Sequence, residues 1–147
     1  MSDLVEITPR FHIGEKVLVG EEHLPPDLWG DQAVVREISV IICEGRNTVL
    51  YGLEVGHSRA YRTALEDVLI SLEELPLECE SIVLRHRYGL WQPVKINDAP
   101  GARDFIGLRG TIEQIYMVAS GEEFRASYYV STGSGRRYIQ EADLTRA

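Results

Sequence analysis

Short apolar runs divided by turn residues make up most of the chain, and several alternate with polar residues as half-buried strands do. Six runs rich in Val, Ile and Tyr stand out, at residues 15–19, 33–42, 49–55, 92–96, 110–118 and 125–131. Turns at 44–47 and 120–123 contain glycine, which adopts a positive φ at low cost. β-branched and aromatic residues between such turns are typical of strands. The pattern predicts an all-β fold.

The same pattern occurs twice, 77 positions apart. The stretch DLWGDQAVVREI at residues 27–38 spaces Asp, Gly and Ile as DFIGLRGTIEQI does at residues 104–115. Nine identical pairs follow this offset: Arg10/Arg87, Val17/Val94, Asp27/Asp104, Gly30/Gly107, Ile38/Ile115, Tyr51/Tyr128, Gly56/Gly133, Arg59/Arg136 and Tyr61/Tyr138. Two residues are dropped after them, before Leu69 answers Leu144. Self-similarity at a fixed period predicts a duplicated structural unit.

Two units are therefore expected, at residues 1–70 and 81–147, joined by a linker at 71–80. Each has four or five short strands and a long first loop, which a small SH3-like barrel accommodates because curling the sheet removes exposed edges. A unit of this size buries only about 60% of the surface that its unfolded chain exposes, so it is marginal alone. We therefore expect two tandem SH3-like barrels, packed as a fixed pair with pseudo-twofold symmetry.

The chain carries a formal net charge of −8, which is unevenly distributed. Residues 1–73 hold 6 basic and 13 acidic residues, a net of −7, whereas residues 74–147 hold 9 and 10, a net of −1. An acidic half argues against general nucleic-acid binding, whose affinity comes mainly from neutralising phosphates. It favours a basic protein partner, because opposite charge accelerates encounter.

Two features of the sequence indicate the cellular compartment. No apolar run approaches the ~20 residues of a membrane-spanning helix, and the first residues lack the pattern of a secretory signal. Cys43 and Cys79 are the only cysteines and belong to no CxxC motif, which is typical of a reducing environment. We expect a cytoplasmic protein without a membrane segment.

No motif for catalysis or metal binding is apparent in the sequence. The four histidines are not spaced as paired metal ligands, and no cysteine lies near one. Gly133-Ser134-Gly135 lacks the Lys-Ser/Thr pair and the helix that follow a phosphate loop, so it is interpreted as a hairpin turn. We expect no enzyme activity, no metal and no cofactor.

The two tryptophans are candidates for a binding surface, because neither recurs in the other unit. Trp29 corresponds to Ile106 and Trp91 to Gly14. Packing between the units is the other interpretation of these tryptophans. Two tyrosines recur and are expected to be structural: Tyr51/Tyr128 and Tyr61/Tyr138.

Basic residues of the second unit offer an alternative site. Arg125, Arg136 and Arg137 lie in a segment that also holds Tyr138, and aromatic residues among basic ones can stack on single-stranded nucleic acid. Strand alternation sends neighbouring residues to opposite faces, however, and pairing of these arginines with the acidic first unit competes directly. Nucleic-acid binding is therefore considered unlikely, and a protein partner is preferred.

Four short motifs carry a family resemblance: FHIGEKV at 11–17, Trp29-Gly30, YGLEV at 51–55 and YRTALEDVL at 61–69. Together they resemble small bacterial SH3-like domains, and among these most of all a class of immunity proteins from polymorphic toxin systems. The second unit fits the pattern at 107–112 and 128–130. It departs from it at Leu90, and the first unit departs at Ala33, where the family has a loop glycine.

The resemblance implies a non-enzymatic inhibitor that binds a cognate toxin. Many such toxins resemble nucleases with basic clefts, which an acidic loop can occupy. The loop at 20–31 contains two prolines, which limit the entropy lost on binding. Its predicted partner-binding residues are Glu21, Glu22, Asp27, Trp29 and Asp31. The alternatives are a KOW- or Tudor-like nucleic-acid-binding module and an accessory subunit of a larger bacterial complex.

Overall fold

The computed structural model of the chain describes residues 3–20, 31–44, 46–56, 60–73, 81–120 and 123–147. Its strands are β1 (Asp3–Ile7), β2 (Lys16–Val19), β3 (Asp31–Cys43), β4 (Arg46–Val55), β5 (Ala60–Leu65), β6 (Leu69–Ser71), β7 (Ile82–His86), β8 (Pro93–Ile96), β9 (Arg109–Ser120), β10 (Glu123–Thr132), β11 (Gly135–Gln140) and β12 (Leu144–Arg146). The helical elements among these residues are three single 3₁₀ turns: η2 (Glu66–Val68), η3 (Arg103–Phe105) and η4 (Glu141–Asp143). The all-β prediction is confirmed.

The same order of strands occurs in the first half (residues 3–73) and the second half (81–147) of the chain. In the first half the strands pair in the order β6-β2-β3-β4-β5, and in the second half in the order β12-β8-β9-β10-β11. A single 3₁₀ turn precedes the last strand of each half. The duplicated sequence pattern is thus accompanied by a duplicated strand order.

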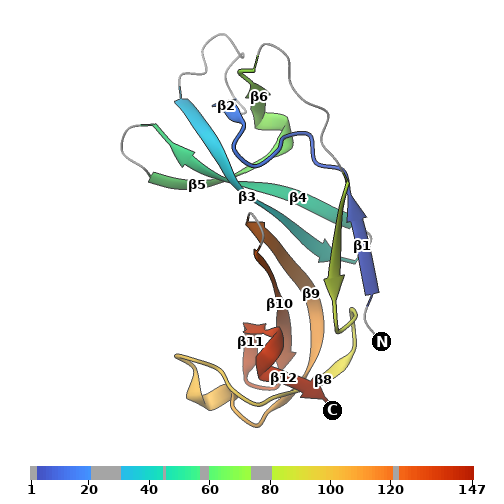
Figure 1. The fold of residues 1–147 in the computed structure, drawn as a ribbon. Coiled ribbons are helices and arrows are strands. Elements are labelled where there is room, and N and C mark those ends of the chain that lie inside the picture. Colours follow the sequence, from blue (N-terminus) through green and yellow to red (C-terminus); the bar gives the residue numbers. More distant parts are fainter. Residues whose placement is uncertain (1–2, 21–30, 45, 57–59, 74–80, 121–122) are drawn as a thin grey trace.

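Two strand pairings join the halves symmetrically. β3 pairs with β9 in a register that includes Val40↔Met117, and β1 pairs with β7 in a register that includes Glu6↔Val83. Both of these pairs join residues 77 positions apart, so each pairing brings equivalent residues together as a twofold interface does. Figure 1 shows β3 and β9 side by side in the middle of the molecule, with β1 and β7 beside them.

The halves therefore share one sheet instead of forming two separate barrels. Within the described residues both sheets are open: β5 pairs only with β4, and β6 only with β2. The prediction of two tandem SH3-like barrels is not confirmed at this level of detail. Most of the predicted linker, residues 74–80, lies outside the described residues.

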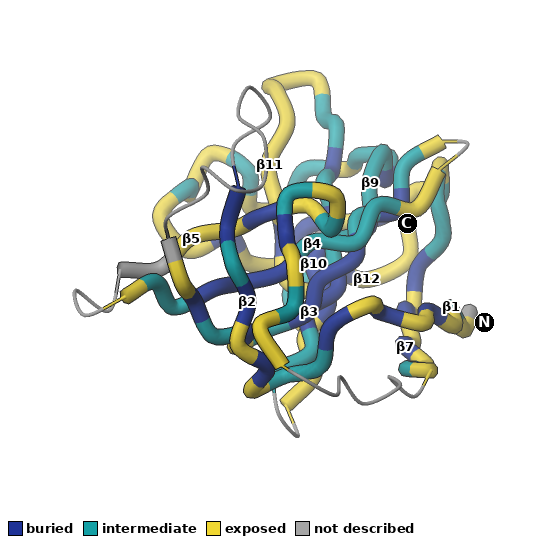
Figure 2. Tube along the Cα trace, turned by 90° about the horizontal axis from the view of Figure 1, so that it is seen from above, coloured by how far each residue is buried: buried dark blue, intermediate teal, exposed yellow. Residues whose placement is uncertain are grey.

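One apolar core runs through both halves. Side chains of the two shared strands meet there, with Ile38 and Val40 of β3 and Ile115 and Met117 of β9 all buried. Seen from above, buried residues follow the central strands, and exposed residues lie mainly on the turns and the periphery (Figure 2). The core makes the two halves energetically interdependent, because burying apolar surface is the main favourable term in folding.

A buried tyrosine fixes the first segment of each half in the same way. The Tyr51 hydroxyl accepts a hydrogen bond from the backbone N–H of Arg10 at 2.9 Å and donates one to the Glu66 carboxylate. The second half repeats this arrangement with Tyr128, Arg87 and Glu141. Burial, followed by the hydrogen bond to the carboxylate, raises the pKa of both tyrosines above the ordinary value. The prediction that Tyr51 and Tyr128 are structural is confirmed.

The other recurring tyrosine pair was aligned wrongly by the sequence offset. In the sheet Tyr51 lies opposite Ala64, and Tyr128 lies opposite Ile139, so the offset is 75 residues in β5 and β11. The two-residue difference therefore lies in the turn before β5, which is longer in the first half. Tyr138 consequently occupies the position of Thr63, and it has no aromatic equivalent in the first half.

Candidate binding surface on the shared sheet

The predicted acidic loop falls mostly outside the described residues. Glu21, Glu22, Asp27 and Trp29 lie within 21–30, and Asp31 is the first residue of β3. The loop as a partner-binding site therefore stays a prediction.

The three arginines of the alternative site do not form one basic patch. Arg125 on β10 forms an ion pair with Glu37 of the first half, at 3.7 Å. Arg136 on β11 forms an ion pair with Glu113 of its own half, at 3.1 Å. Arg137 follows Arg136 on the same strand, so it lies on the opposite face of the sheet. One of the three pairs with the acidic half, as the competing interpretation expected.

Six strands run side by side through the junction in the order β5-β4-β3-β9-β10-β11. Successive side chains of a strand alternate between the two faces of a sheet. In β9 the core takes Ile115 and Met117, which leaves Gln114, Tyr116 and Val118 on the other side. We call this second side the outer face.

Three tyrosines gather on the outer face of the second half, and we call them the tyrosine platform: Tyr116, Tyr129 and Tyr138. Tyr138 lies centrally, with its ring centroid 4.7 Å from that of Tyr129 and 6.2 Å from that of Tyr116. Its hydroxyl donates a hydrogen bond to the Gln114 side chain at 2.9 Å, which holds the ring across β10. Because Tyr138 is 47% exposed, the platform presents aromatic surface to the outside.

The platform is specific to the second half. Tyr116 corresponds to Ser39 at the offset of 77, and Tyr129 corresponds to Gly52. Sequence reasoning missed this surface because Tyr138 was paired with Tyr61 and so interpreted as structural. A comparison of the two copies along strands, with the turn lengths known, would have found three positions where small or polar residues became aromatic.

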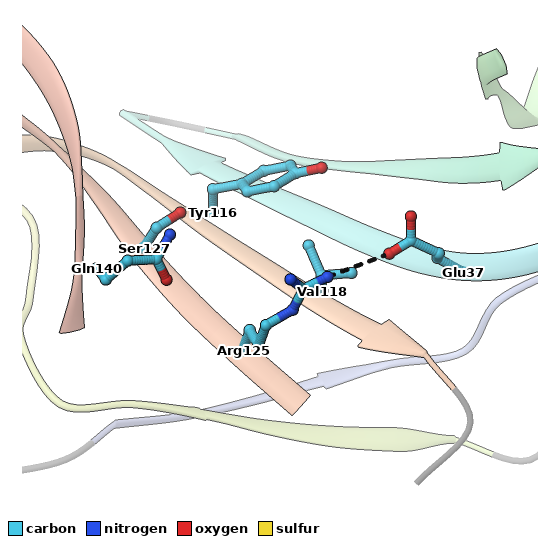
Figure 3. A pocket seen from close by; sticks show the side chains of 6 residues that line it. All are labelled: Glu37, Tyr116, Val118, Arg125, Ser127 and Gln140. Atoms are coloured by element: carbon cyan, nitrogen blue, oxygen red, sulfur yellow. Dashed lines mark ion pairs between the residues drawn. The ribbon is translucent and has the colours of Figure 1, made fainter. Parts of the chain in front are cut away.

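A pocket of about 180 Å³ adjoins the platform. It is lined by Glu37, Tyr116, Val118, Arg125, Ser127 and Gln140 (Figure 3). β3 of the first half supplies Glu37, and β9, β10 and β11 of the second half supply the other residues. The pocket thus lies across the junction, and it exists only because the two halves share a sheet.

The pocket offers both charged and apolar walls. The Arg125 guanidinium faces the Glu37 carboxylate across it (Figure 3), and their side chains are 65% and 24% exposed. Tyr116 and Val118 form the apolar part, and Ser127 contributes a hydroxyl. Such a site can hold a side chain that has an apolar stem and a polar end.

A broader depression lies beyond Tyr129 on the same face. It has a volume of about 530 Å³ and is wide open to the outside. Its walls are polar apart from the tyrosine ring: Tyr129, Ser131, Thr132, Gly133, Gly135 and Arg136. Pocket, platform and depression together make one continuous surface that extends from the junction over the second half.

Trp91 lies on a turn and is 53% exposed, so it does not pack between the halves. Its φ is +65°, in the left-handed region that bulky residues rarely adopt. The equivalent Gly14 has a φ of +93°, and both residues donate their N–H at 2.7 Å, to Ile112 and Val35 respectively. The turn is thus conserved between the halves, although only one copy has the glycine that suits it.

Two further observations on the described residues concern metal ions and membranes. No group of three or more His, Cys, Asp or Glu side chains within them is arranged to hold a metal ion. None of the helical elements seen in them is long and apolar enough to cross a membrane.

No protein-family model matches this chain, and neither a curated protein nor a solved structure shows significant similarity to it. Any functional conclusion therefore depends on the residues and the geometry of the chain itself.

Proposed function

We propose that this chain is a non-enzymatic protein-binding module and, more specifically, an immunity protein that binds and inhibits a basic toxin domain. The observation that carries the proposal is the outer face of the second half, where the tyrosine platform, with Tyr138 exposed, adjoins a small pocket. Tyrosine is enriched at the energetic centres of protein interfaces, because its ring is large and rigid and its hydroxyl can pair with polar groups.

The shape of the surface supports a protein partner over a small molecule. The pocket of about 180 Å³ is smaller than the ~300–1,000 Å³ typical of sites for small ligands. The larger depression is too open to enclose a ligand. A partner can instead insert one side chain into the pocket and cover the platform with its own surface.

Charge supports a basic partner. The chain has a net charge of −8, most of it in residues 1–73, and the pocket includes Glu37 from that acidic half. Opposite charge accelerates association and excludes acidic competitors. The predicted loop residues Glu21, Glu22, Asp27 and Asp31, with Trp29, would extend the same contact.

Two further parts of the proposal rest on the sequence. The strand order of each half, with a 3₁₀ turn before its last strand, supports an SH3-like ancestry for both units. The cysteine usage supports a cytoplasmic location, where an immunity protein would meet a toxin.

Nucleic-acid binding remains the second candidate, because the tyrosine platform lies beside Arg136. Stacking of bases on tyrosines is sequence-tolerant and is usually combined with a basic groove. Here Arg136 and Arg125 each pair with a glutamate, which reduces the positive charge available to phosphates. The geometry therefore favours protein over nucleic acid.

Affinity purification from the native bacterial cell tests the proposal. The wild-type chain is compared with the variant Tyr116→Ser/Tyr138→Thr, which copies the residues of the first half. Phe124→Ala is the matched control, because Phe124 is an exposed aromatic residue on β10 whose strand position places it on the face opposite to the platform. We expect a stoichiometric protein that the wild type and the control retain and the double variant loses.

Two results would contradict the proposal. Recovery of the same protein with the wild type, the double variant and the control would show that the platform is not part of the interface. Loss of the bound material after nuclease treatment, with steep salt dependence, would favour the nucleic-acid candidate.

A further inference from the structure

A line of apolar side chains crosses the outer face from one half of the chain to the other. Leu65 lies opposite Leu50 in the first half, and Ile41 lies opposite Tyr116 across the junction. Beyond Tyr116, the ring of Tyr138 follows at a centroid distance of 6.2 Å. Each of the six strands supplies one residue to this line, which we call the apolar band: Leu65 of β5, Leu50 of β4, Ile41 of β3, Tyr116 of β9, Tyr129 of β10 and Tyr138 of β11.

Strand alternation places the three aliphatic members of the band on the outer face. Next to each of them along its strand is a residue buried in the core: Ala64, Tyr51 and Val40. Successive side chains of a strand point to opposite faces. Leu65, Leu50 and Ile41 therefore lie on the same face as the tyrosine platform.

The band is exposed at its ends and recessed in the middle. Leu65 is 39% exposed and Tyr138 is 47% exposed, whereas Ser39 and Val118, which adjoin the middle of the band, are buried. The recess leads into the pocket of about 180 Å³ that Tyr116 and Val118 line (Figure 3). An element of a partner that rests on both ends therefore has room for one long side chain between them.

The spacing of the strands suits a helix. Neighbouring strands lie about 4.8 Å apart, and one helical turn rises about 5.4 Å. A helix that lies across the strands therefore presents about one side chain to each of them. An extended segment in the same direction places the side chains of one face about 6.6 Å apart, so it falls out of step with the strands. The intervals between six strands span about 24 Å, which is the length of about 16 helical residues.

Charge specifies a basic helix. The chain has a net charge of −8, and residues 1–73, which supply the aliphatic part of the band, have a net charge of −7. A helix with apolar residues on one face and lysine or arginine on the other matches both the band and this charge. A second copy of the chain does not provide it, because the helical elements among its described residues are single turns.

Resting on the proposed function, we propose that the apolar band is the docking site for one basic amphipathic helix of the partner, which lies across the junction and contacts both halves. The helix covers the tyrosine platform at one end and Leu65 at the other. The interface depends on the shared sheet, because the pairing of β3 with β9 brings the two parts of the band together.

The duplication restricts the helix to one direction across the sheet. The pseudo-twofold relation between β3 and β9 generates a second diagonal on the outer face, at which the equivalent residues are mostly polar or small: Gln140, Ser127, Val118, Ser39, Gly52 and Thr63. The two diagonals cross at the junction, and one of them is apolar along its whole length. A bound helix is therefore held along that diagonal.

A designed peptide is the probe that tests the proposal. It has about 18 residues and blocked ends, with leucines along one helical face and lysines and arginines on the other. The comparison peptide has the same composition in scrambled order. Titration of the isotope-labelled full chain, followed by NMR, should show saturable shifts in both halves, at Leu65, Leu50, Ile41, Tyr116 and Tyr138. The scrambled peptide should bind at least about tenfold more weakly, because it lacks the apolar face.

Two variants test the ends of the band. Leu65→Gln copies Gln140 of the second half, and Tyr138→Thr copies Thr63 of the first half. Each should weaken binding of the peptide by about fivefold, because each removes apolar surface that the helix covers. Leu72→Gln is the matched control, since Leu72 is 41% exposed and follows β6, which pairs with β2 and lies outside the band. It should change the affinity by less than about twofold.

Several results with the peptide would overturn the proposal. These are no binding at millimolar concentration, equal binding of the scrambled peptide, shifts confined to the second half, and equal losses of affinity for Leu65→Gln and Leu72→Gln.

Capture of the partner from the native cell separates this proposal from the proposed function. If the Tyr116→Ser/Tyr138→Thr variant loses the partner but Leu65→Gln retains it fully, docking along the whole band is wrong while the proposed function stands. If the peptide binds across the band as expected and no captured protein depends on the platform, the proposed function fails instead.

Discussion

Tyr51 donates its hydroxyl hydrogen to Glu66, and 77 positions later Tyr128 donates the same bond to Glu141. The two carboxylates are separated by only 75 positions, because the first half has the longer turn before β5. The bond has thus kept its partners although the chain between them changed in length. This indicates that the contact is needed by each half.

Removing either hydroxyl should destabilise the fold. We expect Tyr51→Phe and Tyr128→Phe each to lower the free energy of unfolding by about 1.5–3 kcal/mol, because each loses a hydrogen bond to a charged group. Chemical denaturation measures the change. Tyr138→Phe is the control, since its hydroxyl makes an exposed hydrogen bond to Gln114, and it should cost less than about 1 kcal/mol. An equal loss of unfolding free energy in all three variants would contradict the structural role assigned to the Tyr51 and Tyr128 hydroxyls.

Alkaline pH should weaken the fold through the same two tyrosines. Their pKa is raised in the folded state above the unfolded value of about 10, mainly by burial. The stability that they contribute is therefore complete below about pH 10 and is lost as pH rises toward the folded pKa. Each tyrosine adds a slope of up to about 1.4 kcal/mol per pH unit in that window. Denaturation of the wild type and the Tyr51→Phe/Tyr128→Phe variant, at several values above about pH 9, should show a shallower decline for the variant.

The cost of adding a side chain at Gly14 should come from its backbone conformation alone. Gly14 has a φ of +93°, and a Cβ added there meets nothing within 4 Å. We expect Gly14→Ala to lower the free energy of unfolding by about 1–2 kcal/mol, because the left-handed region disfavours a side chain. Gly133→Ala is the matched control, since its surroundings are equally open and its φ lies outside that region. Thermal melts that rank the two variants the other way would contradict this explanation.

An amide should be able to replace the buried carboxylate of Glu15 without a large loss of stability. Glu15 is 1% exposed, and its Oε1 lies 2.7 Å from Nδ1 of His12 and accepts the His12 backbone N–H at 3.3 Å. The equivalent Gln92 accepts the N–H of Gly89 in the same way, at 2.9 Å. Glu15→Gln should therefore change stability by less than about 1 kcal/mol, because a neutral amide costs less to bury.

The reverse change provides the contrast. Gln92→Glu introduces a carboxylate opposite a glycine, without a histidine to pair with it. We expect a loss of about 1–3 kcal/mol, as for a poorly satisfied charged group. Denaturation of both variants at neutral pH checks the asymmetry, and similar losses in the two halves would contradict the role given to His12.

The sequence predicted the strands and the repeat well, because both depend on local patterns of apolar residues. Val17, Ile38 and Leu53 lie in three of the apolar runs from which the strands were predicted, and all three are buried. The pairing of β3 with β9 was not predicted. Each is a long apolar strand that could also have paired only within its own half. No local sequence pattern distinguishes that arrangement from pairing across the junction.

The candidate surface was harder to predict for a different reason. Tyr138 could be assigned to it only once its cross-strand neighbours were known, and a shift of two residues in one turn was enough to hide the relationship. Glu37 belongs to the pocket although it lies 79 positions before Tyr116, because the junction brings the two strands together. The acidic loop with Glu21, Glu22 and Trp29 stays a sequence-based prediction.

The antiparallel contact between β3 and β9 makes the two copies poor candidates for separate expression. Cutting the chain between its two copies would uncover a long strand with unpaired backbone groups and an apolar face on each fragment, which promotes self-association. Separate expression of either copy should therefore yield symmetric dimers or insoluble material. Joining two such copies in one chain keeps these edges covered and lets the two outer surfaces carry different residues.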